Sequence, residues 1–328
     1  MSKKCLYCYQ ALPESAAQEY HEQCSLSFFG NKIAPTLGYS LEQMSELAKD
    51  ILERSVAVPG VQPKLSLSLI NDEVNHTKNG RLTIMGALGG NYIFKPPSEF
   101  YAEMPQNEHL TMRMAEEVFS LKTVPSSLIR LNSGELSYIT KRIDRTADGQ
   151  KIHMIDMFQV LEAFDKYKSS MERIAKAIGL YSENTYLDKI YFFELTIFSF
   201  LTGNSDMHLK NFSMIDNQGQ WDLAPAYDLL NVAIVNPEDT EELALTIEGK
   251  KRRLKFEHFQ RFGSGMGLTG KQIRNAMFRF FKGKDEAFQW IENSFLSAAH
   301  QDLYKQVMEE RYQILGYADY AQHWKMPD

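Results

Sequence analysis

The segment 203–213 (GNSDMHLKNFS) gathers a carboxylate, an imidazole, an amine and two side-chain amides directly after an apolar run. Asp206 and Asn211 are separated by four residues, which is the spacing of a kinase catalytic loop. In such a loop the aspartate orients the attacking hydroxyl, because a carboxylate is anionic at neutral pH and accepts hydrogen bonds. The asparagine binds magnesium, which prefers hard oxygen ligands. Lys210 is placed to neutralise charge on a phosphate during its transfer.

Asp228 lies in an otherwise apolar stretch, LAPAYDLL, seventeen residues after Asn211. A buried aspartate must be paired or metal-bound, because an isolated charge is costly to bury. An aspartate after a strand pair forms the second half of the metal site in kinases, so the two segments together favour phosphoryl transfer. Two structural explanations stay open. Residues 203–213 could be a polar loop of capping side chains, and Asp228 could cap the segment that begins at Leu229.

Lys95 ends a β-rich run, YIFKPP, at residues 92–97. In the first lobe of a kinase, a strand lysine contacts the α- and β-phosphates of ATP and is held by a glutamate on a helix. Glu108 lies thirteen residues later, near the start of the next predicted helix, and is the candidate partner. A lysine at a strand end is otherwise a solvated side chain, so the order of the motifs supports this role.

The three cysteines of the chain all lie within the first 24 residues, where Cys5-x2-Cys8 is followed by His21-x2-Cys24. An odd number confined to one end is not a disulfide framework and fits a reducing compartment. Four nitrogen and sulfur ligands are the usual number for a structural Zn²⁺ site, and the first pair has the spacing of a zinc knuckle. The alternative is a small packed knob with buried free thiols.

The elements that position these residues change in character along the chain. Strand patterns and one main helix dominate up to about residue 144, and helical patterns dominate after it. The predicted strands span residues 65–69, 82–85, 91–95 and 138–141, with a short pair near 212–214 and 221–223. The predicted helices span residues 41–53, 107–119, 154–163, 170–179, 184–202, 270–281, 285–298 and 301–314. We therefore predict an α+β fold with a Cys/His knob at 1–30, a strand-rich N-lobe at 31–144 and a helical C-lobe at 145–328.

Composition and charge narrow the possible functions. The chain has 328 residues, 44% of them hydrophobic, which suits one large two-lobed unit or two domains. The net charge of −6 argues against nonspecific nucleic-acid binding, although residues 250–255 (KKRRLK) form a local basic patch. The longest apolar run, residues 190–201, is too short to span a bilayer and contains Glu194, so it predicts a buried helix. Since no signal peptide is recognised at the start, we expect a cytoplasmic location without membrane association.

Six segments, taken in order, resemble the HipA family of bacterial toxin kinases. They are SVAVPGVQPKLSL, YIFKPP, NEH, TKRIDR, GNSDMHLKNFS and PAYDLL, and they cover about residues 55–230. The resemblance implies a bilobal, protein-kinase-like fold. It also implies transfer of the ATP γ-phosphate to serine or threonine of a protein with the help of Mg²⁺. Family members act on aminoacyl-tRNA synthetases, so a substrate of that class is implied.

The resemblance also implies a role for each matched residue. Asp206 would be the catalytic aspartate, and Asn211 and Asp228 would bind Mg²⁺. Lys95 would contact the phosphates of ATP. The other implied nucleotide-binding positions are the turn Pro59, Gly60, Val61, Gln62, Pro63 and Lys64, the hinge segment Lys141, Arg142 and Ile143, and the residues His208, Leu209, Lys210 and Tyr227.

Partners and regulation follow from the same resemblance. Such kinases are restrained by a helix-turn-helix antitoxin of the HipB type, so any link to DNA is indirect. Residues 1–54 are too short for an N-terminal subdomain that longer members carry, and in short members a separate small HipS-like protein supplies it. Ala57 and Pro59 cannot accept phosphate, although family members often carry an autophosphorylated serine in this loop, and Ser55 lies farther out. Two other functions stay open: a small-molecule kinase, and a noncatalytic corepressor that works with the antitoxin.

Overall fold

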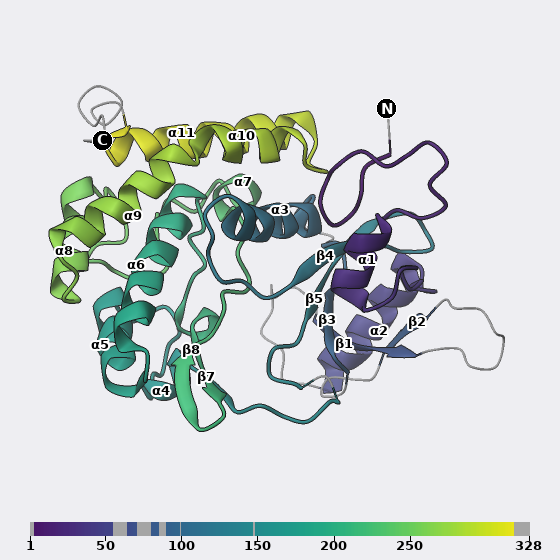
Figure 1. Ribbon diagram of the computed structural model, residues 1–328, viewed down its shortest axis with the longest axis horizontal. Coiled ribbons are helices and arrows are strands. Elements are labelled where there is room, and N and C mark those ends of the chain that lie inside the picture. The colour runs from purple at the N-terminus through teal and green to yellow at the C-terminus, as the bar shows by residue number, and fades with distance from the viewer. Residues whose placement is uncertain are drawn as a thin grey trace. The chain divides into compact units, whose positions relative to one another are not determined.

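The computed structural model describes residues 3–54, 64–70, 80–84, 90–98, 100–146 and 148–317 and divides the chain into two compact units (Figure 1). Unit 1 consists of Met1–His109, Val124–Lys151 and Asn293–Phe295. Unit 2 consists of Leu110–Thr123, Ile152–Glu292 and Leu296–Asp328. Within the described ranges, no helix is both long enough and apolar enough to cross a bilayer.

Unit 1 is built on a five-stranded antiparallel sheet with the strand order β2-β1-β3-β5-β4. The strands are β1 (Leu65–Ile70), β2 (Arg81–Ile84), β3 (Tyr92–Lys95), β4 (Ser126–Arg130) and β5 (Leu136–Lys141). All except β4 were predicted at nearly these bounds. The sequence of β4, SSLIR, does not alternate between apolar and polar residues, because the sheet buries its first four positions on both faces.

Helix α1 (Glu22–Phe29) packs on this sheet through aromatic rings. Phe28 and Phe29 are buried, and their ring centroids lie 5.9 Å and 6.2 Å from that of Tyr92 on β3. The helix ends at Gly30, whose φ of 78° is a left-handed conformation that glycine adopts without strain. The amino-terminal segment is therefore part of the core of unit 1.

Two further helices begin in unit 1. Helix α2 (Leu41–Arg54) confirms the helix predicted at residues 41–53. Helix α3 (Met104–Glu117) confirms the one predicted at 107–119 but starts three residues earlier. The unit boundary falls within α3, so its first part, which carries Glu108, belongs with the sheet of unit 1.

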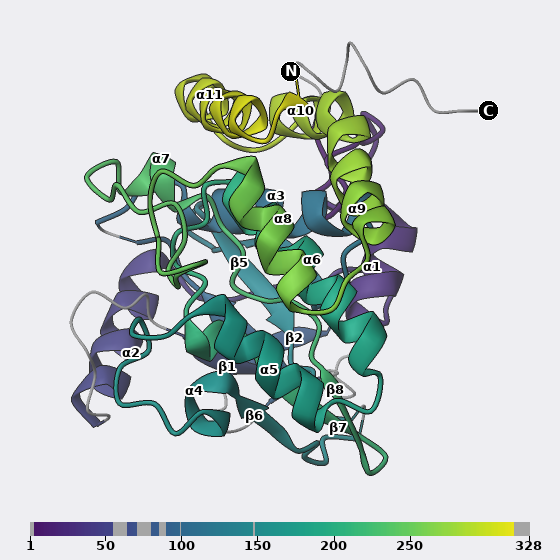
Figure 2. The same ribbon diagram turned by 90° about the vertical axis from the view of Figure 1, so that its left-hand side faces the viewer.

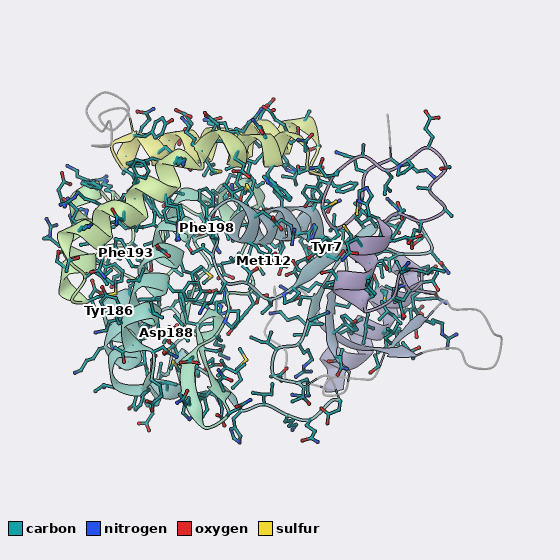
Figure 3. All side chains as sticks on the ribbon, viewed as in Figure 1. Tyr7, Met112, Tyr186, Asp188, Phe193 and Phe198 are labelled. Carbon is teal, nitrogen blue, oxygen red and sulfur yellow. The ribbon has the colours of Figure 1, made fainter. Side chains whose placement is uncertain are left out.

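Unit 2 is mainly helical (Figure 2). Its sheet is antiparallel with the order β6-β7-β8. The strands are β6 (Met154–Asp156), β7 (Ser213–Asn217) and β8 (Gln220–Leu223), and the helices are α4 (Met157–Val160), α5 (Met171–Tyr181), α6 (Thr185–Leu201), the 3-10 helix η1 (Leu209–Asn211), α7 (Val232–Val235), α8 (Phe256–Gly265), α9 (Gly270–Lys282), α10 (Lys284–Glu292) and α11 (Ala298–Ile314). The buried helix predicted over residues 190–201 is confirmed, since Phe193 and Phe198 on α6 are fully buried (Figure 3).

The helix predicted at residues 154–163 is wrong in its first part. Residues 154–156 pair with β7 as strand β6, and the short helix α4 begins only after Asp156. The Asp156 side chain accepts a hydrogen bond from Gln159 N at 2.9 Å, which caps α4 at its start. The helix predicted at 285–298 is likewise shorter, because Ser297 caps a new helix, α11.

Candidate active site

Helix α6 ends just before segment 203–213, and the chain turns sharply at Gly203. The residue has a φ of +67°, a left-handed conformation that side chains rarely adopt. A Cβ atom at Gly203 would lie 2.9 Å from Val307 Cγ1 and 3.0 Å from Asn231 Oδ1. Glycine is therefore required both by the backbone conformation and by the surrounding side chains, which fix where the next residues emerge.

Asp206 presents a carboxylate whose side chain is 44% exposed, so it is accessible to a reacting molecule. The hydroxyl of Tyr167 donates a hydrogen bond to Asp206 Oδ1 at 2.8 Å. The ring of Tyr167 lies edge-on to that of His208, with centroids 5.0 Å apart. Tyr167 was missed in the sequence, where no motif distinguishes it within the polar segment DKYKSS.

Asn211 is held by the backbone of Asp206. Its Nδ2 donates to the carbonyl oxygen of Asp206 at 2.9 Å, and the residue is only 6% exposed. A carbonyl oxygen only accepts hydrogen bonds, so the nitrogen of the amide must face it and the oxygen Oδ1 must face away. This orientation leaves Oδ1, a hard oxygen donor, on the side of the amide away from the Asp206 carbonyl.

The pKa of His208 is influenced by both carboxylates of the candidate site, Asp206 and Asp228. Burial lowers the pKa of His208 below its ordinary value, while the charges of Asp206 and Asp228 oppose that shift. The net pKa is lowered, so the imidazole is neutral at neutral pH. The charges of the two segments that were singled out in the sequence therefore both act against the effect of burial on one imidazole, and a hydrogen bond from Tyr227 to Lys210 O joins those segments directly.

Tyr227 connects the segment of Asp228 to the loop of Asp206. Its hydroxyl donates to the carbonyl oxygen of Lys210 at 2.9 Å and lies 2.6 Å from Ser213 Oγ. Burial raises the pKa of Tyr227, and the charge of Asp228 raises it further. Tyr227 therefore stays protonated, and its hydrogen bonds fix the backbone directly before Asp228.

The backbone of Asp228 is itself unusual, with a φ of 57°. Aspartate and asparagine are the non-glycine residues that adopt this left-handed conformation most readily. Residues held in sparsely populated conformations cluster at functional sites. Asp228 is partly buried, and a simple capping role before Leu229 does not require such a conformation.

Buried hydrogen bonds anchor the start of the Asp228 segment to α6. The carboxylate of Asp188, which is 4% exposed, accepts from Leu223 N at 2.7 Å and from Ser182 Oγ at 2.6 Å. Tyr191 Oη accepts from Ala226 N at 2.8 Å. Helix α6 therefore positions both segments, one through its end at Gly203 and the other through Asp188 and Tyr191 (Figure 3 labels Asp188).

The other residues of the 206–211 loop differ in exposure. Lys210 is exposed, and its Nζ lies 4.9 Å from the centroid of the Phe158 ring. Leu209 is fully buried and belongs to the hydrophobic core of unit 2. A solvent-exposed lysine beside buried Asn211 is positioned to meet an anion.

In unit 1, Lys95 and Glu108 form a buried ion pair. Lys95 Nζ lies 2.6 Å from Glu108 Oε1, and the two side chains are 6% and 2% exposed. Tyr138 on β5 lies beside the pair, with its ring centroid 5.3 Å from Lys95 Nζ. The structure therefore excludes the solvated lysine that the sequence left open and confirms the predicted partner.

Replacing Lys95 with methionine should destabilise unit 1 by about 3–5 kcal/mol, because the carboxylate of Glu108 would stay buried without its ammonium partner. The double variant Lys95→Met with Glu108→Leu should recover most of that loss. Urea denaturation measures both changes. Lys305→Met is the matched control, since Lys305 pairs with Glu292 at the surface. Its loss should lower the free energy of unfolding by less than about 1 kcal/mol. Equal effects of Lys95→Met and Lys305→Met would contradict the prediction.

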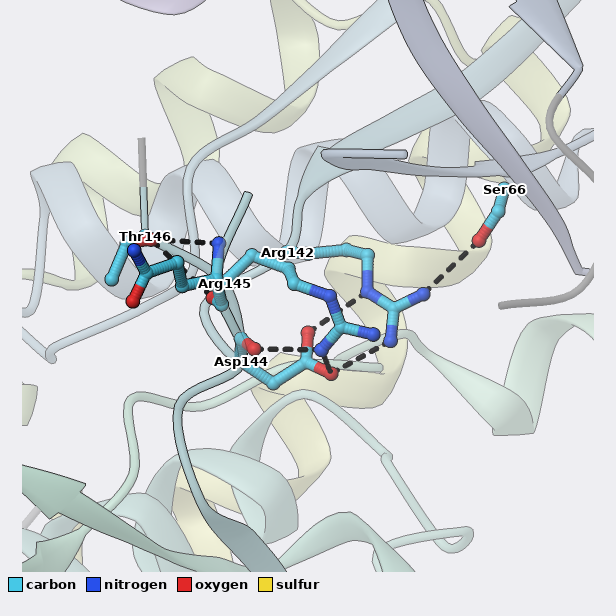
Figure 4. A network of polar contacts seen from close by, with 6 residues as sticks. Ser66, Arg142, Asp144, Arg145 and Thr146 are labelled. Atoms are coloured by element: carbon cyan, nitrogen blue, oxygen red, sulfur yellow. Dashed lines mark hydrogen bonds and ion pairs between the residues drawn. The ribbon is translucent and has the colours of Figure 1, made fainter. Parts of the chain in front are cut away.

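The predicted hinge segment begins at Lys141, the last residue of β5, which pairs with Tyr92 on β3, and continues through Arg142 and Ile143. Arg142 N donates to Asn91 O at 2.9 Å, and its guanidinium forms a bidentate pair with Asp144 at 2.8 Å and 2.6 Å (Figure 4). Burial alone would raise the pKa of Asp144, but the hydrogen bonds and charges of Arg142 and Arg145 lower it. The segment is thus fixed by an ionised carboxylate shared by two arginines.

The predicted phosphate-binding turn and the Cys/His cluster complete the set of residues singled out in the sequence. Pro59, Gly60, Val61, Gln62 and Pro63 lie outside the described residues, as do Ser55 and Ala57, while Lys64 is exposed just before β1. In the amino-terminal part of unit 1, the donor atoms of Cys5, Cys8, His21 and Cys24 all lie within 4.8 Å of one another.

Comparison with known proteins relates the chain to one family. Residues 56–287 match the HipA-like C-terminal domain. A Haemophilus influenzae protein, named only as a candidate kinase, is 26% identical over 312 residues, which are 86% of this chain and 88% of that protein. The candidate kinase Y4dM of Sinorhizobium fredii is 32% identical over 234 residues, 66% of this chain and 55% of that protein. The serine/threonine-protein kinase toxin HipA of Shewanella oneidensis is 26% identical over 236 residues, 65% of this chain and 52% of the toxin.

Solved structures show the same fold. HipA, in its Shewanella oneidensis complex with HipB and operator DNA, aligns with a TM-score of 0.65 and 21% identity over 82% of this chain and 67% of that chain. The Helicobacter pylori proinflammatory kinase CtkA aligns with a TM-score of 0.51 and 14% identity over 70% of this chain and 90% of that chain. The chain spans about half the length of Y4dM and of the HipA toxin. Because residues 56–287 are well over half of the sequence, the chain belongs to the HipA-like family, and the relatives it matches are named as kinases.

Proposed function

We propose that this chain is an ATP- and Mg²⁺-dependent protein kinase that transfers the γ-phosphate of ATP to a serine or threonine hydroxyl. The observation that carries the proposal is the geometry of the 206–211 loop. It combines an accessible Asp206 carboxylate with an Asn211 amide whose oxygen faces away from the Asp206 carbonyl. Asp228, with its left-handed backbone, carries a second hard oxygen donor and directly follows Tyr227, whose hydroxyl donates to Lys210 O in the same loop.

The donor set fits a magnesium ion. Asn211 Oδ1 and the Asp228 carboxylate are hard oxygen ligands, and two protein ligands of this kind are typical where phosphates and water complete the coordination. When bound, Mg²⁺ would offset negative charge on the β- and γ-phosphates. Exposed Lys210 would offset further charge from the protein side, and the buried pair with Glu108 would hold Lys95 for the α- and β-phosphates.

Asp206 has the chemistry required at the acceptor. It hydrogen-bonds the incoming hydroxyl and takes its proton as the oxygen attacks the γ-phosphorus. A new bond forms between that oxygen and phosphorus, the bond from phosphorus to the β–γ bridging oxygen breaks, and ADP leaves.

Tyr167 is proposed as a positioning residue that fixes the Asp206 carboxylate through Oδ1 and leaves Oδ2 for the substrate. Tyr167→Phe should lower kcat by about threefold to tenfold, the effect of one lost hydrogen bond, with KM for ATP unchanged. Steady-state kinetics measure the split. Tyr181→Phe, at an exposed position on α5, is the control and should match wild type. An unchanged kcat, or a raised one that shows the hydroxyl obstructing the site, would contradict this role.

The HipA relative also suggests partners. Since a solved HipA neighbour was captured with HipB and operator DNA, we propose that this chain binds a HipB-like helix-turn-helix antitoxin and reaches DNA only through it. An aminoacyl-tRNA synthetase as the phosphorylated protein and a HipS-like helper remain predictions from the family resemblance.

Radiolabelled ATP tests the proposed reaction. The purified chain is incubated with γ-labelled ATP, Mg²⁺ and a cell lysate, and the label is separated into protein-bound and small-molecule fractions. A protein kinase transfers label to protein serine or threonine. Transfer only to small molecules would replace the proposal with a small-molecule kinase, and no transfer to any acceptor would favour a noncatalytic corepressor.

A further inference from the structure

The four potential metal ligands near the amino terminus converge on one point. Cys8 Sγ lies 3.4 Å from His21 Nδ1, Cys24 Sγ lies 3.9 Å from it, and Cys5 Sγ is within 4.8 Å of every other donor. In a tetrahedral zinc site, bonds of about 2.3 Å to sulfur and 2.0–2.1 Å to nitrogen place those atoms about 3.6 Å apart. The two measured sulfur–nitrogen distances bracket that separation.

The ring of His21 is oriented as a metal ligand requires. Its Nε2 lies 3.2 Å from the carbonyl oxygen of Ala11. That oxygen only accepts hydrogen bonds, so Nε2 carries the proton of the neutral ring, and Nδ1 presents its lone pair to the sulfurs. Metal-bound histidines almost always donate their other ring N–H to a carbonyl or carboxylate in this way.

The backbone around the first two cysteines forms a tight turn. Cys5 N donates to Gln10 O at 2.9 Å, and Tyr9 N donates back to Cys5 O at 3.0 Å. Tyr9, directly after Cys8, has a φ of 64°, a conformation that is costly for a tyrosine. Leu6 N donates to Glu19 O at 2.9 Å, which ties this turn to the segment that carries His21.

We propose that Cys5, Cys8, His21 and Cys24 bind one structural Zn²⁺ ion through three thiolates and one imidazole. Zinc is favoured because thiolate and imidazole ligands in tetrahedral geometry select it over Mg²⁺ or Ca²⁺. All four positions are supplied by protein, so the ion has no open site for catalysis. Packed free thiols would account for the burial of Cys5 and for a hydrogen bond from a thiol to His21 Nδ1, but they do not require three sulfurs and one nitrogen to lie within 4.8 Å of one another.

The proposed zinc clip, residues 3–30, also reaches the region of the Lys95–Glu108 pair. Tyr9 Oη lies 2.9 Å from His109 Nδ1 in a buried contact, and His109 follows Glu108 on α3. Leu128 N on β4 donates to Leu6 O at 3.3 Å. By fixing Tyr9, the metal would stabilise the start of α3 where Glu108 is held.

Metal content tests the site without reference to catalysis. Protein purified without chelators should contain about one zinc per chain, measured by elemental analysis, and Cys8→Ser and His21→Asn should each contain less than about one tenth of that. His153→Asn, which removes an exposed histidine of unit 2, should keep the full amount. Should the variants fail to fold, wild-type protein stripped by a chelator and reloaded with Co²⁺ should show the strong visible absorption of tetrahedral cobalt thiolates. Wild-type protein without zinc that also lacks this absorption with Co²⁺ would overturn the proposal.

Hydrogen exchange tests the consequence for α3. Stripping zinc from the wild-type protein should speed amide exchange in residues 3–30 and at the start of α3, whereas exchange in α9 should not change. This readout is independent of kinase activity, so it can fail while the proposed function stands. If amides at the start of α3 exchange no faster after zinc removal, the metal does not stabilise the part of α3 that holds Glu108, and this consequence would be contradicted.

Discussion

Replacing Asp206 with asparagine should lower the rate of phosphoryl transfer by about 10²–10⁴-fold and leave nucleotide affinity near that of wild type. Asparagine has almost the same shape, and its amide oxygen can still accept the hydrogen bond from Tyr167. It cannot take a proton from the acceptor hydroxyl. Nucleotide affinity should survive because Asn211, Asp228 and Lys95 are unchanged.

Two measurements on the same preparation separate chemistry from binding for Asp206→Asn. Transfer is followed at saturating ATP, and nucleotide binding is followed by calorimetry with Mg²⁺. Asp302→Asn is the control, because Asp302 is a highly exposed aspartate on α11. Retention of more than about a tenth of the wild-type rate in Asp206→Asn would show that another group accepts the proton.

Asp228→Asn should lower kcat by about 10²–10³-fold and remove most of the dependence of nucleotide binding on Mg²⁺. The substitution deletes a ligand charge but preserves the backbone, because asparagine also tolerates the left-handed conformation at φ 57°. Asp228→Ala would mix metal loss with backbone strain. Titration of ATP binding with Mg²⁺ measures the effect, and a titration identical to that of wild type would refute Asp228 as a metal ligand.

The Lys95–Glu108 pair and the Asp206–Asn211 loop could be predicted from sequence, because each role depends on residue type and spacing. Their environments could not be predicted. Lys95 is almost fully buried, and the ring of Tyr138 lies 5.3 Å from its Nζ because Lys95 on β3 pairs with Tyr138 on β5. The orientation of the Asn211 amide depends on a hydrogen bond to a single backbone carbonyl.

Tyr167 shows what sequence patterns leave out. Its contact with Asp206 joins residues 39 positions apart, and no spacing rule links a loop tyrosine to a later aspartate. Strand β4 was not predicted, because its pairing with β5 and not its periodicity makes it a strand. The start of α4 was predicted too early, because the Asp156 cap sets where that helix begins. The Cys/His cluster was foreseen from ligand spacing, but the bond from His21 to Ala11 that orients the ring was not.

Phosphoproteomics after induced expression tests the central proposal most directly, with the intact chain compared with Asp206→Asn at matched protein levels. The proposed mechanism predicts at least one cellular protein that gains phosphoserine or phosphothreonine with the intact chain and not with the variant. If that protein mediates toxicity, growth arrest should follow the same pattern. Identical phosphorylation profiles for the two proteins, with the intact chain shown to bind ATP and Mg²⁺, would contradict a protein kinase that acts through Asp206.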